Sequence, residues 1–313
     1  MLDFIYSFSS AMLGATSQGI LWGVMALGVY ITFKILDFAD MTVDGSFALG
    51  GCTCAILIVK GCNPLLALSV ATIAGVFAGM ITGLLHTKLR IPGILAGILM
   101  MLALYSVNLH IMGGPNTSLK RTSATIMGFI GNIFNLSAHL KDNANSVASL
   151  ITGIIFAVLL ILALYWFFGT ELGSSIRATG DNERMSRAQG VNTDNMKILA
   201  LMISNGLVSL SGGLVMQQQR FGDVSMGIGT IVIGLASIII GEVIFGHGLS
   251  FWMHLVGVMV GSILYRLIIA VVLQLGMDAQ DMKLFTAIIV AIALSIPVLK
   301  TKFPKKKQET KNA

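Results

Sequence analysis

Long apolar stretches recur along the whole chain and restrict the folds open to it. They cover about residues 14–36, 45–59, 64–87, 91–112, 147–168, 196–216, 226–246, 251–273 and 284–299. A transmembrane helix needs about 20 predominantly apolar residues. Continuous apolar runs favour helices over the alternating pattern of a membrane β-barrel. We therefore expect an all-α membrane protein, a polytopic bundle of about eight to nine transmembrane helices.

The composition agrees with this fold class and excludes other functions. The chain is 55% hydrophobic and only 11% charged, whereas a soluble domain carries about 25% charged residues. The net charge of +6 does not indicate nucleic-acid binding, because six lysines from Lys300 onward supply much of it. Cys52, Cys54 and Cys62 lack the spacing of a zinc site, so we interpret them as small buried thiols and expect no metal site.

The runs predict one transmembrane domain over residues 1–300, followed by a basic cytoplasmic tail over residues 301–313. The run 45–59 is short and rich in glycine, so it could be a broken or re-entrant segment buried in protein. This interpretation gives eight full spans and one doubtful segment. Residues 2–12 are expected to form an interfacial helix before the first span.

Basic residues set the expected orientation. With the tail and the loop 169–195 inside, thirteen Lys and Arg residues face the cytoplasm and six face outward, leaving Arg266 within a span. This bias follows the positive-inside rule. It places the loop 113–146 outside, together with the N-terminus if nine spans are present. A re-entrant segment 45–59 would move the N-terminus inside.

Small residues spaced four apart predict one close helix contact. Gly75, Gly79 and Gly83 recur along a single apolar run. Glycines at this spacing allow helix backbones to approach closely in lipid. We expect this run to pack tightly against another span.

A charged, Gly-punctuated stretch, ELGSSIRATGDNERMSRAQGVNTDN, separates two spans near the middle of the chain. Asp181 could cap a helix with Glu183 in its first turn, and Gly190 could end that helix after roughly eight residues, about 12 Å. Asp194 could cap the next transmembrane helix. The short helix would present three arginines, Arg177, Arg184 and Arg187, as a docking element. A solvated loop that merely obeys the positive-inside rule is the alternative.

The same stretch resembles the cytoplasmic signature of permeases in the branched-chain amino acid and ribose importer family. The matching residues are Gly173, Arg177, Ala178, Gly180, Asn182, Ala188, Gly190 and Val191. Residues 19–51 resemble the family's first span and the broken segment after it, with Phe38, Ala39 and Gly45 in matching places. Residues 234–264 resemble its Gly-rich C-terminal spans.

The resemblance implies an inner-membrane permease subunit of an ABC importer, with no chemistry of its own. Its partners would be a cytoplasmic ATPase that carries ATP-Mg, an extracytoplasmic substrate-binding protein and a second permease copy or paralogue. The chain contains no GxxxxGK[ST] motif, so the ATPase must be a separate chain. The residues expected to couple to that ATPase are Gly173, Arg177, Ala178, Gly180, Asp181, Asn182, Arg184, Arg187 and Gly190.

The stretch LDFADMTVDGSF departs from the commonest family pattern through Asp37, Asp40 and Asp44. It resembles a subgroup paired with binding proteins for tryptophan, tyrosine or related solutes, which suggests an amino acid or related compound as the substrate. Two local structures are open. The three carboxylates could be solvated in a cytoplasmic turn, with Asp44 capping the following helix. Alternatively, the segment breaks inside the bundle near the pathway, at Gly45 and Gly50–Gly51.

Polar residues within the spans are candidates for the translocation pathway, because ionisable groups are costly at membrane depth. The candidates are Asp40, Asp44, Asn108, Asn205, Glu242 and Arg266. Glu242 could instead pair with Lys34. Arg266 could bind a substrate carboxylate or, by snorkelling, a lipid phosphate. Tyr105, Ser106, Ser204 and Ser209 could line a polar path or form interhelical hydrogen bonds.

The alternatives to a permease are a secondary transporter or channel and a membrane-embedded enzyme. A secondary transporter or channel would favour paired intramembrane charges or inverted repeats, and neither is evident. A membrane-embedded enzyme would need a paired His/Asp or Ser/Lys constellation, which the sequence lacks.

Overall fold

The computed structural model describes residues 2–120, 122–134, 144–246, 250–274, 284–288, 290–291 and 295, with side chains from residue 8 onward. The predicted basic tail and half of the last apolar run, 284–299, lie outside these residues. The described elements, in chain order, are α1 (Leu2–Tyr30), η1 (Ile31–Ile35, a π-helix), α2 (Thr42–Val59), α3 (Pro64–Thr87), α4 (Gly93–Met112), β1 (Asn116–Ser118), α5 (Ile126–Ile133), α7 (Ala144–Phe168), α8 (Glu171–Asp181), α9 (Glu183–Ala188), α10 (Thr193–Gln219), β2 (Phe221–Asp223), α11 (Thr230–Phe245) and α12 (Phe251–Gln274).

The long helices confirm a polytopic membrane protein. Seven helices in the described part of the chain are long and apolar enough to cross a membrane. The doubtful run 45–59 belongs to one of them, the continuous helix α2. The run 226–246, expected to span fully, instead forms the 16-residue helix α11 after a turn. The sequence predicted the incomplete span in the run 45–59, whereas the structure has the short helix in the run 226–246.

The backbone around the run 45–59 differs from both expected local structures. Gly45 and Gly50–Gly51 lie inside a regular helix, so the backbone does not break there. The irregular segment is 36–41, upstream of α2, where Asp37 has a φ of 53°. Residues 2–12 form the first turns of α1 and not a separate interfacial helix.

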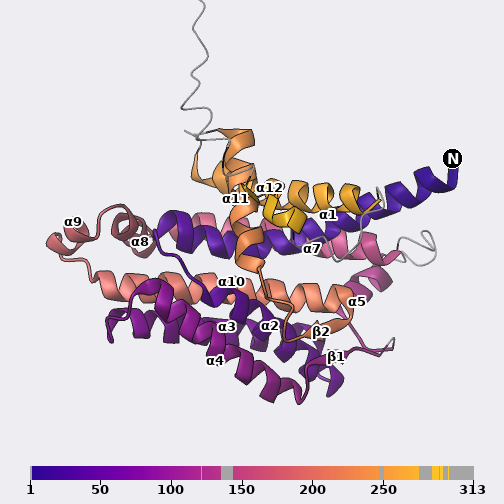
Figure 1. Ribbon diagram of the computed structural model, residues 1–313, viewed down its shortest axis with the longest axis horizontal. Helices are drawn as coiled ribbons and strands as arrows, with labels where there is room; N and C mark the ends of the chain where they lie inside the picture. Colours follow the sequence, from indigo (N-terminus) through magenta and orange to yellow (C-terminus); the bar gives the residue numbers. More distant parts are fainter. Residues whose placement is uncertain are drawn as a thin grey trace, which may run out of the picture.

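Helix α10 runs through the middle of the molecule, with α1 on one side and α2 and α3 on the other (Figure 1). Its contact with α3 confirms the predicted close packing. Cβ atoms added at Gly75 and Gly79 would collide with the backbone of α10, and one at Gly83 would lie 2.9 Å from Ile198 Cα. Because glycine leaves no side chain between these helices, their backbones meet directly.

The two ends of the bundle differ. Helices α8 and α9 lie at one end, and α1 starts at the opposite end (Figure 1). That opposite end also holds the antiparallel pair of β1 and β2. The positive-inside rule predicts that the end with α8 and α9 is cytoplasmic, which would put the N-terminal end of α1 on the outer side.

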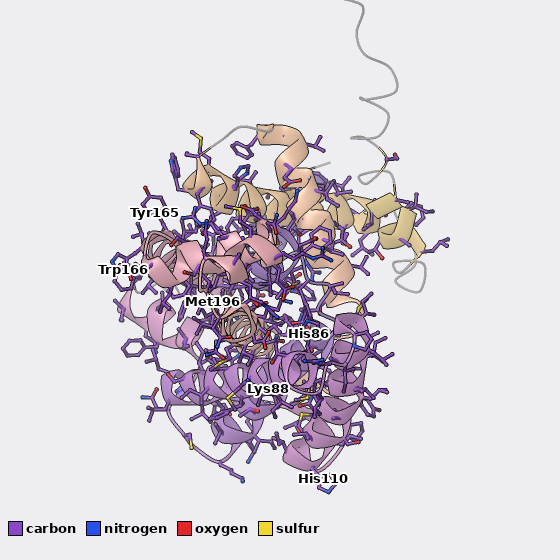
Figure 2. The ribbon with its side chains drawn as sticks, turned by 90° about the vertical axis from the view of Figure 1, so that its left-hand side faces the viewer. His86, Lys88, His110, Tyr165, Trp166 and Met196 are labelled. Atoms are coloured by element: carbon purple, nitrogen blue, oxygen red, sulfur yellow. The ribbon has the colours of Figure 1, made fainter. Side chains whose placement is uncertain are left out.

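The outer faces of α3, α4 and α7 carry exposed apolar side chains. Figure 2 views the molecule from the end that holds α8 and α9, and it shows Tyr165 and Trp166 of α7 at the edge of the bundle. Trp166 is 73% exposed. Large apolar side chains of this kind suit contact with lipid. The chain is a multi-pass protein of the membrane.

Candidate functional site

Two short helices, α8 and α9, connect the spans α7 and α10 at the end of the bundle that the positive-inside rule predicts to be cytoplasmic. We call residues 171–188 the α8–α9 segment. The sequence predicted one helix of roughly eight residues after Asp181, whereas the structure has an 11-residue helix before residue 182 and a six-residue helix after it. The charged stretch is thus more helical than a solvated loop would be.

The helix caps differ from those predicted by one or two positions. The side chain of Asn182, not that of Asp181, caps α9 by accepting a hydrogen bond from the Met185 amide at 3.0 Å. Likewise Asn192, not Asp194, caps α10. Asp and Asn are equally good capping residues, so the residue that caps each helix is the one that stands where the helix begins. Gly190, with a φ of 87°, lies just past the end of α9 as predicted.

Two glycines hold α8 against the ends of neighbouring helices. A Cβ at Gly180 would collide with the carbonyl of Ile35 in η1. A Cβ at Gly173 would collide with the backbone of Phe167 and Phe168 at the end of α7. Between them Ile176 is fully buried. These glycines are required because backbone packs directly on backbone.

Arg177 fixes the position of α8 instead of projecting from it. Its Nη2 donates a hydrogen bond of 2.6 Å to the carbonyl of Phe168, and its guanidinium lies 5.4 Å from the ring centroid of Phe251 in α12. A cation over an aromatic face is attracted to it. Arg177 therefore links α8 to α7 and α12, which differs from the expected outward-facing role.

A cluster of charged side chains ties α9 to the start of α10. Glu183 accepts from Lys197 Nζ at 2.7 Å and from Arg187 Nη2 at 2.9 Å. Arg187 also bonds Asp194 at 3.0 Å. The hydrogen bond from Lys197 and the two nearby cations hold the pKa of Glu183 below its ordinary value. Arg187 is thus engaged within the protein, although its side chain remains partly exposed.

The outward face of the α8–α9 segment combines apolar and polar side chains. Leu172 is 51% exposed and Met185 is 57% exposed. The exposed residues of the predicted coupling set are Ala178, Asp181, Asn182, Arg184, Arg187 and Gly190. Leu172 and Met185 were not predicted, because a lone apolar residue in a polar stretch gives no distinct signal.

Asp40 lies in a buried polar network and is not solvated. Its side chain accepts hydrogen bonds from the Thr42 amide at 2.9 Å and from Asn205 Nδ2 at 2.7 Å, and Asp40 is 2% exposed. Asn205 in turn accepts from Ser46 Oγ at 2.6 Å. The two pathway candidates Asp40 and Asn205 therefore bond each other and join the start of α2 to the middle of α10.

Asp44 caps a helix, but not the one that follows it. Its carboxylate accepts hydrogen bonds from the amides of Gly229 and Ile231, both at 2.9 Å, and from Thr230 Oγ1 at 2.8 Å. These donors form the N-terminus of α11, where a negative charge is favourable. Asp44 therefore joins α2 to α11, and the expected solvated turn is wrong for this residue. Of the three aspartates, Asp37 is exposed.

The predicted pair of Lys34 and Glu242 is confirmed. Lys34 Nζ lies 2.7 Å from Glu242 Oε1. This contact joins η1 to the C-terminal part of α11. Glu242 is accordingly engaged in a structural pair.

The remaining candidates retain unpartnered atoms. Asn108 donates a long bond of 3.4 Å to the Gly45 carbonyl, and its Oδ1 has no partner among the described residues. Asn108 and Asp44 both line a cavity of about 150 Å³. Arg266 stacks over Trp22, 3.9 Å from the ring centroid, and lines a different cavity. The six candidates do not gather at one place.

The serines of α10 form interhelical hydrogen bonds, one of the two alternatives. Ser204 Oγ donates to the Gly28 carbonyl at 2.8 Å, and Ser209 Oγ donates to the Ala71 carbonyl at 2.6 Å. Both serines are fully buried. Tyr105 and Ser106 lie on an exposed part of α4. In the described part of the chain, no three His, Cys, Asp or Glu side chains come together as metal ligands.

Comparison with known proteins identifies relatives over most of the chain. It is 41% identical over 286 residues, 91% of each chain, to the tyrosine transport system permease protein of Clostridioides difficile (strain R20291). It is 24% identical over 274 residues, 87% of this chain and 81% of the relative, to the ribose import permease protein RbsC of Escherichia coli (strain K12).

A solved structure supports the fold. An inward-facing metal-chelate type ABC transporter matches with a TM-score of 0.50 at 15% identity, covering 93% of this chain and 85% of that one. The family described as the permease component of the branched-chain amino acid transport system matches residues 11–296. With a family match over nearly the whole chain and a relative at 41% identity, this protein belongs to that family and is a permease component of an ABC transporter in the bacterial cell membrane.

Proposed function

We propose that the α8–α9 segment docks onto a separate cytoplasmic ABC ATPase, which binds and hydrolyses ATP-Mg. The observation that carries this proposal is the combination of a fixed backbone and an exposed apolar face. Gly173 and Gly180 hold α8 by direct backbone contact, while Leu172 and Met185 point outward. A coupling element must be firmly held to transmit a movement, and it must offer side chains to the partner. Exposed apolar side chains on a cytoplasmic surface suit a protein interface.

The docking proposal is tested by placing a charge on the exposed face. We expect Met185→Glu to reduce recovery of the cognate ATPase with tagged permease at least about tenfold, because a carboxylate would be desolvated in the interface. Leu89→Glu is the matched control, since Leu89 is 65% exposed in the link between α3 and α4 at the same end. Both variants should insert normally into the membrane.

Equal ATPase recovery with Met185→Glu and with the unmodified permease would contradict docking through this segment. Loss of recovery with both variants would show a non-specific effect of charge at this end and would also remove support for the assignment.

We further propose that two permease copies operate together with two ATPases and an extracytoplasmic binding protein. Each chain carries one α8–α9 segment, and closure of an ATP sandwich requires two ATPase subunits. The mass of the assembly purified in native membrane discs tests this stoichiometry. A complex of one permease and one ATPase that retains ATP-driven transport would contradict it.

The substrate class we propose is an amino acid, with an aromatic amino acid such as tyrosine as the first candidate. This rests on the relative that is 41% identical and is named a tyrosine transport permease, and on the unusual Asp-rich stretch before α2. Uptake of labelled tyrosine, leucine and ribose into vesicles that contain the permease, ATPase and binding protein distinguishes the options. Uptake of ribose alone would refute the amino-acid assignment.

A further inference from the structure

A cavity of about 500 Å³ with both polar and apolar lining residues lies between α1, α7, α10 and α12. Its lining includes the polar side chains Gln18, Asn145, Ser149, Gln218, Gln219 and Arg266. Gln218 and Gln219 end α10, and Asn145 lies in the first turn of α7. The cavity is therefore at the end opposite the α8–α9 segment, on the outer side of the protein. Its volume falls in the range of small-molecule sites, about 300–1,000 Å³.

Arg266 brings a positive charge without a counter-ion to this cavity. Its guanidinium stacks on the Trp22 ring at 3.9 Å. Among the described residues it forms no salt bridge, and its Nε atom is buried with no hydrogen-bond partner. None of the described residues that line the cavity is acidic. An unpaired charge at membrane depth is costly, so an anionic ligand would relieve a penalty that the free protein carries.

Gln218 contributes an unpartnered acceptor to the same cavity. Its Nε2 donates to Ser17 Oγ at 3.0 Å, and Ser17 Oγ donates to the Gly14 carbonyl at 2.8 Å. Because the hydroxyl proton of Ser17 is already used, the amide of Gln218 must be the donor in their contact. This fixes Gln218 Oε1 as a buried acceptor, and it has no partner among the described residues.

We propose that this outer cavity binds the zwitterionic head group of an α-amino acid, with the carboxylate on Arg266 and the ammonium on Gln218 Oε1. Arg266 and Gln218 both line the cavity, each has a buried polar atom without a partner among the described residues, and the ligand would offer a partner to each side chain. A guanidinium binds a carboxylate through two parallel hydrogen bonds, which fixes the orientation of the ligand. The choice of an amino acid rests on the proposed function, whereas the requirement for an oxyanion rests on Arg266 alone.

A lipid phosphate has the same oxyanion chemistry as a carboxylate, so the experiment must separate the two. Purified permease without its ATPase is delipidated in maltoside detergent, and equilibrium binding of radiolabelled L-tyrosine is measured. Tyramine, which lacks the carboxylate, and phosphatidylglycerol serve as competitors. We expect saturable tyrosine binding that unlabelled tyrosine displaces and that neither tyramine nor phosphatidylglycerol displaces.

Substitutions then assign the binding to the cavity. Arg266→Gln should weaken tyrosine binding at least about tenfold, as expected for loss of a charge-assisted hydrogen bond. Arg266→Lys, which keeps the charge but loses the planar fork, should give an intermediate loss. Gln218→Leu should weaken tyrosine binding, and tyramine should still fail to displace tyrosine from this variant. Lys60→Gln is the control, because Lys60 is an exposed cation beyond the end of α2 on the same side.

Three results would overturn the proposal: no tyrosine binding, equal binding by wild type and Arg266→Gln, or displacement of tyrosine by phosphatidylglycerol. The last result would assign Arg266 to a lipid. Thermal unfolding of each variant shows whether a loss of binding is only a loss of folding, and Arg266→Lys provides the measurement if Arg266→Gln fails to fold. Tyrosine uptake by the complete transporter without binding at this cavity would leave the proposed function intact and refute the site alone.

Discussion

Asp44 connects two helices that are far apart in the sequence, and its removal should loosen both. We predict that Asp44→Ala lowers the free energy of unfolding by about 2 kcal/mol, at the upper end of the range for a lost helix cap, because three donors at the start of α11 lose their acceptor. Thermal unfolding of the purified permease measures this change. Asp37→Asn, an exposed position in the segment before α2, should be nearly neutral. Equal stability of the two variants would contradict the capping role.

At this scale the sequence predicted one of the contacts between residues of opposite charge, and it predicted the wrong backbone partners for Asp44. Lys34 and Glu242 were paired correctly because positive-inside counting placed both near the cytoplasmic surface. The partners of Asp44 are two backbone amides and a threonine hydroxyl at the junction between α11 and the turn before it, which ends with a φ of 86° at Gly229. Every residue has an amide, so no pattern of side chains indicates which amides a carboxylate will meet. The same reason explains why Asn182 was missed as a cap beside Asp181.

At the scale of elements, the packing of α3 on α10 depends on the absence of a Cβ atom. We predict that Gly79→Ala destabilises the protein by about 1–3 kcal/mol, because the added methyl would collide with the carbonyl of Leu201, and backbone cannot rotate away. Gly14→Ala in α1 is the matched control, since nothing lies within 4 Å of its added Cβ. That control should be neutral or slightly stabilising. Comparable losses in both variants would argue against a specific α3–α10 contact.

The lengths of the elements were predicted less well than their packing. By hydropathy the run 226–246 is a continuous apolar segment, yet the first residues of this run form a turn that contains Gly227 and Gly229. Small residues keep the mean hydropathy high while the backbone leaves the helix. In α2 the opposite occurred, because Gly50 was interpreted as a break although it serves as a contact surface against Ser209 of α10. Glycine has both uses in membrane helices, and only the neighbouring helix shows which applies.

At the scale of the whole molecule, the arrangement of the two ends can be measured with native cysteines. Cys62 is exposed just beyond α2, whereas Cys52 and Cys54 are buried; the expectation that all three are buried was therefore wrong. We predict that a membrane-impermeant maleimide labels Cys62 in intact cells with a sealed plasma membrane. In a Cys62→Ser background, Ser174→Cys on α8 should be labelled only after permeabilisation. The reverse pattern would invert the orientation and place the α8–α9 segment outside.

The direct contact between Gly180 and the carbonyl of Ile35 has a mechanical consequence. A side chain between two helices can change rotamer and absorb a small displacement, but here one backbone rests on another. The contacted carbonyl belongs to Ile35, the last residue of η1, which is the π-helical end of the first span. The residue before it, Lys34, forms an ion pair with Glu242 of α11. No flexible side chain between α8 and η1 can therefore absorb a force that is applied to α8. It reaches α1, at 29 residues the longest of the described helices, and α11 together, so a displacement of α8 would move both helices.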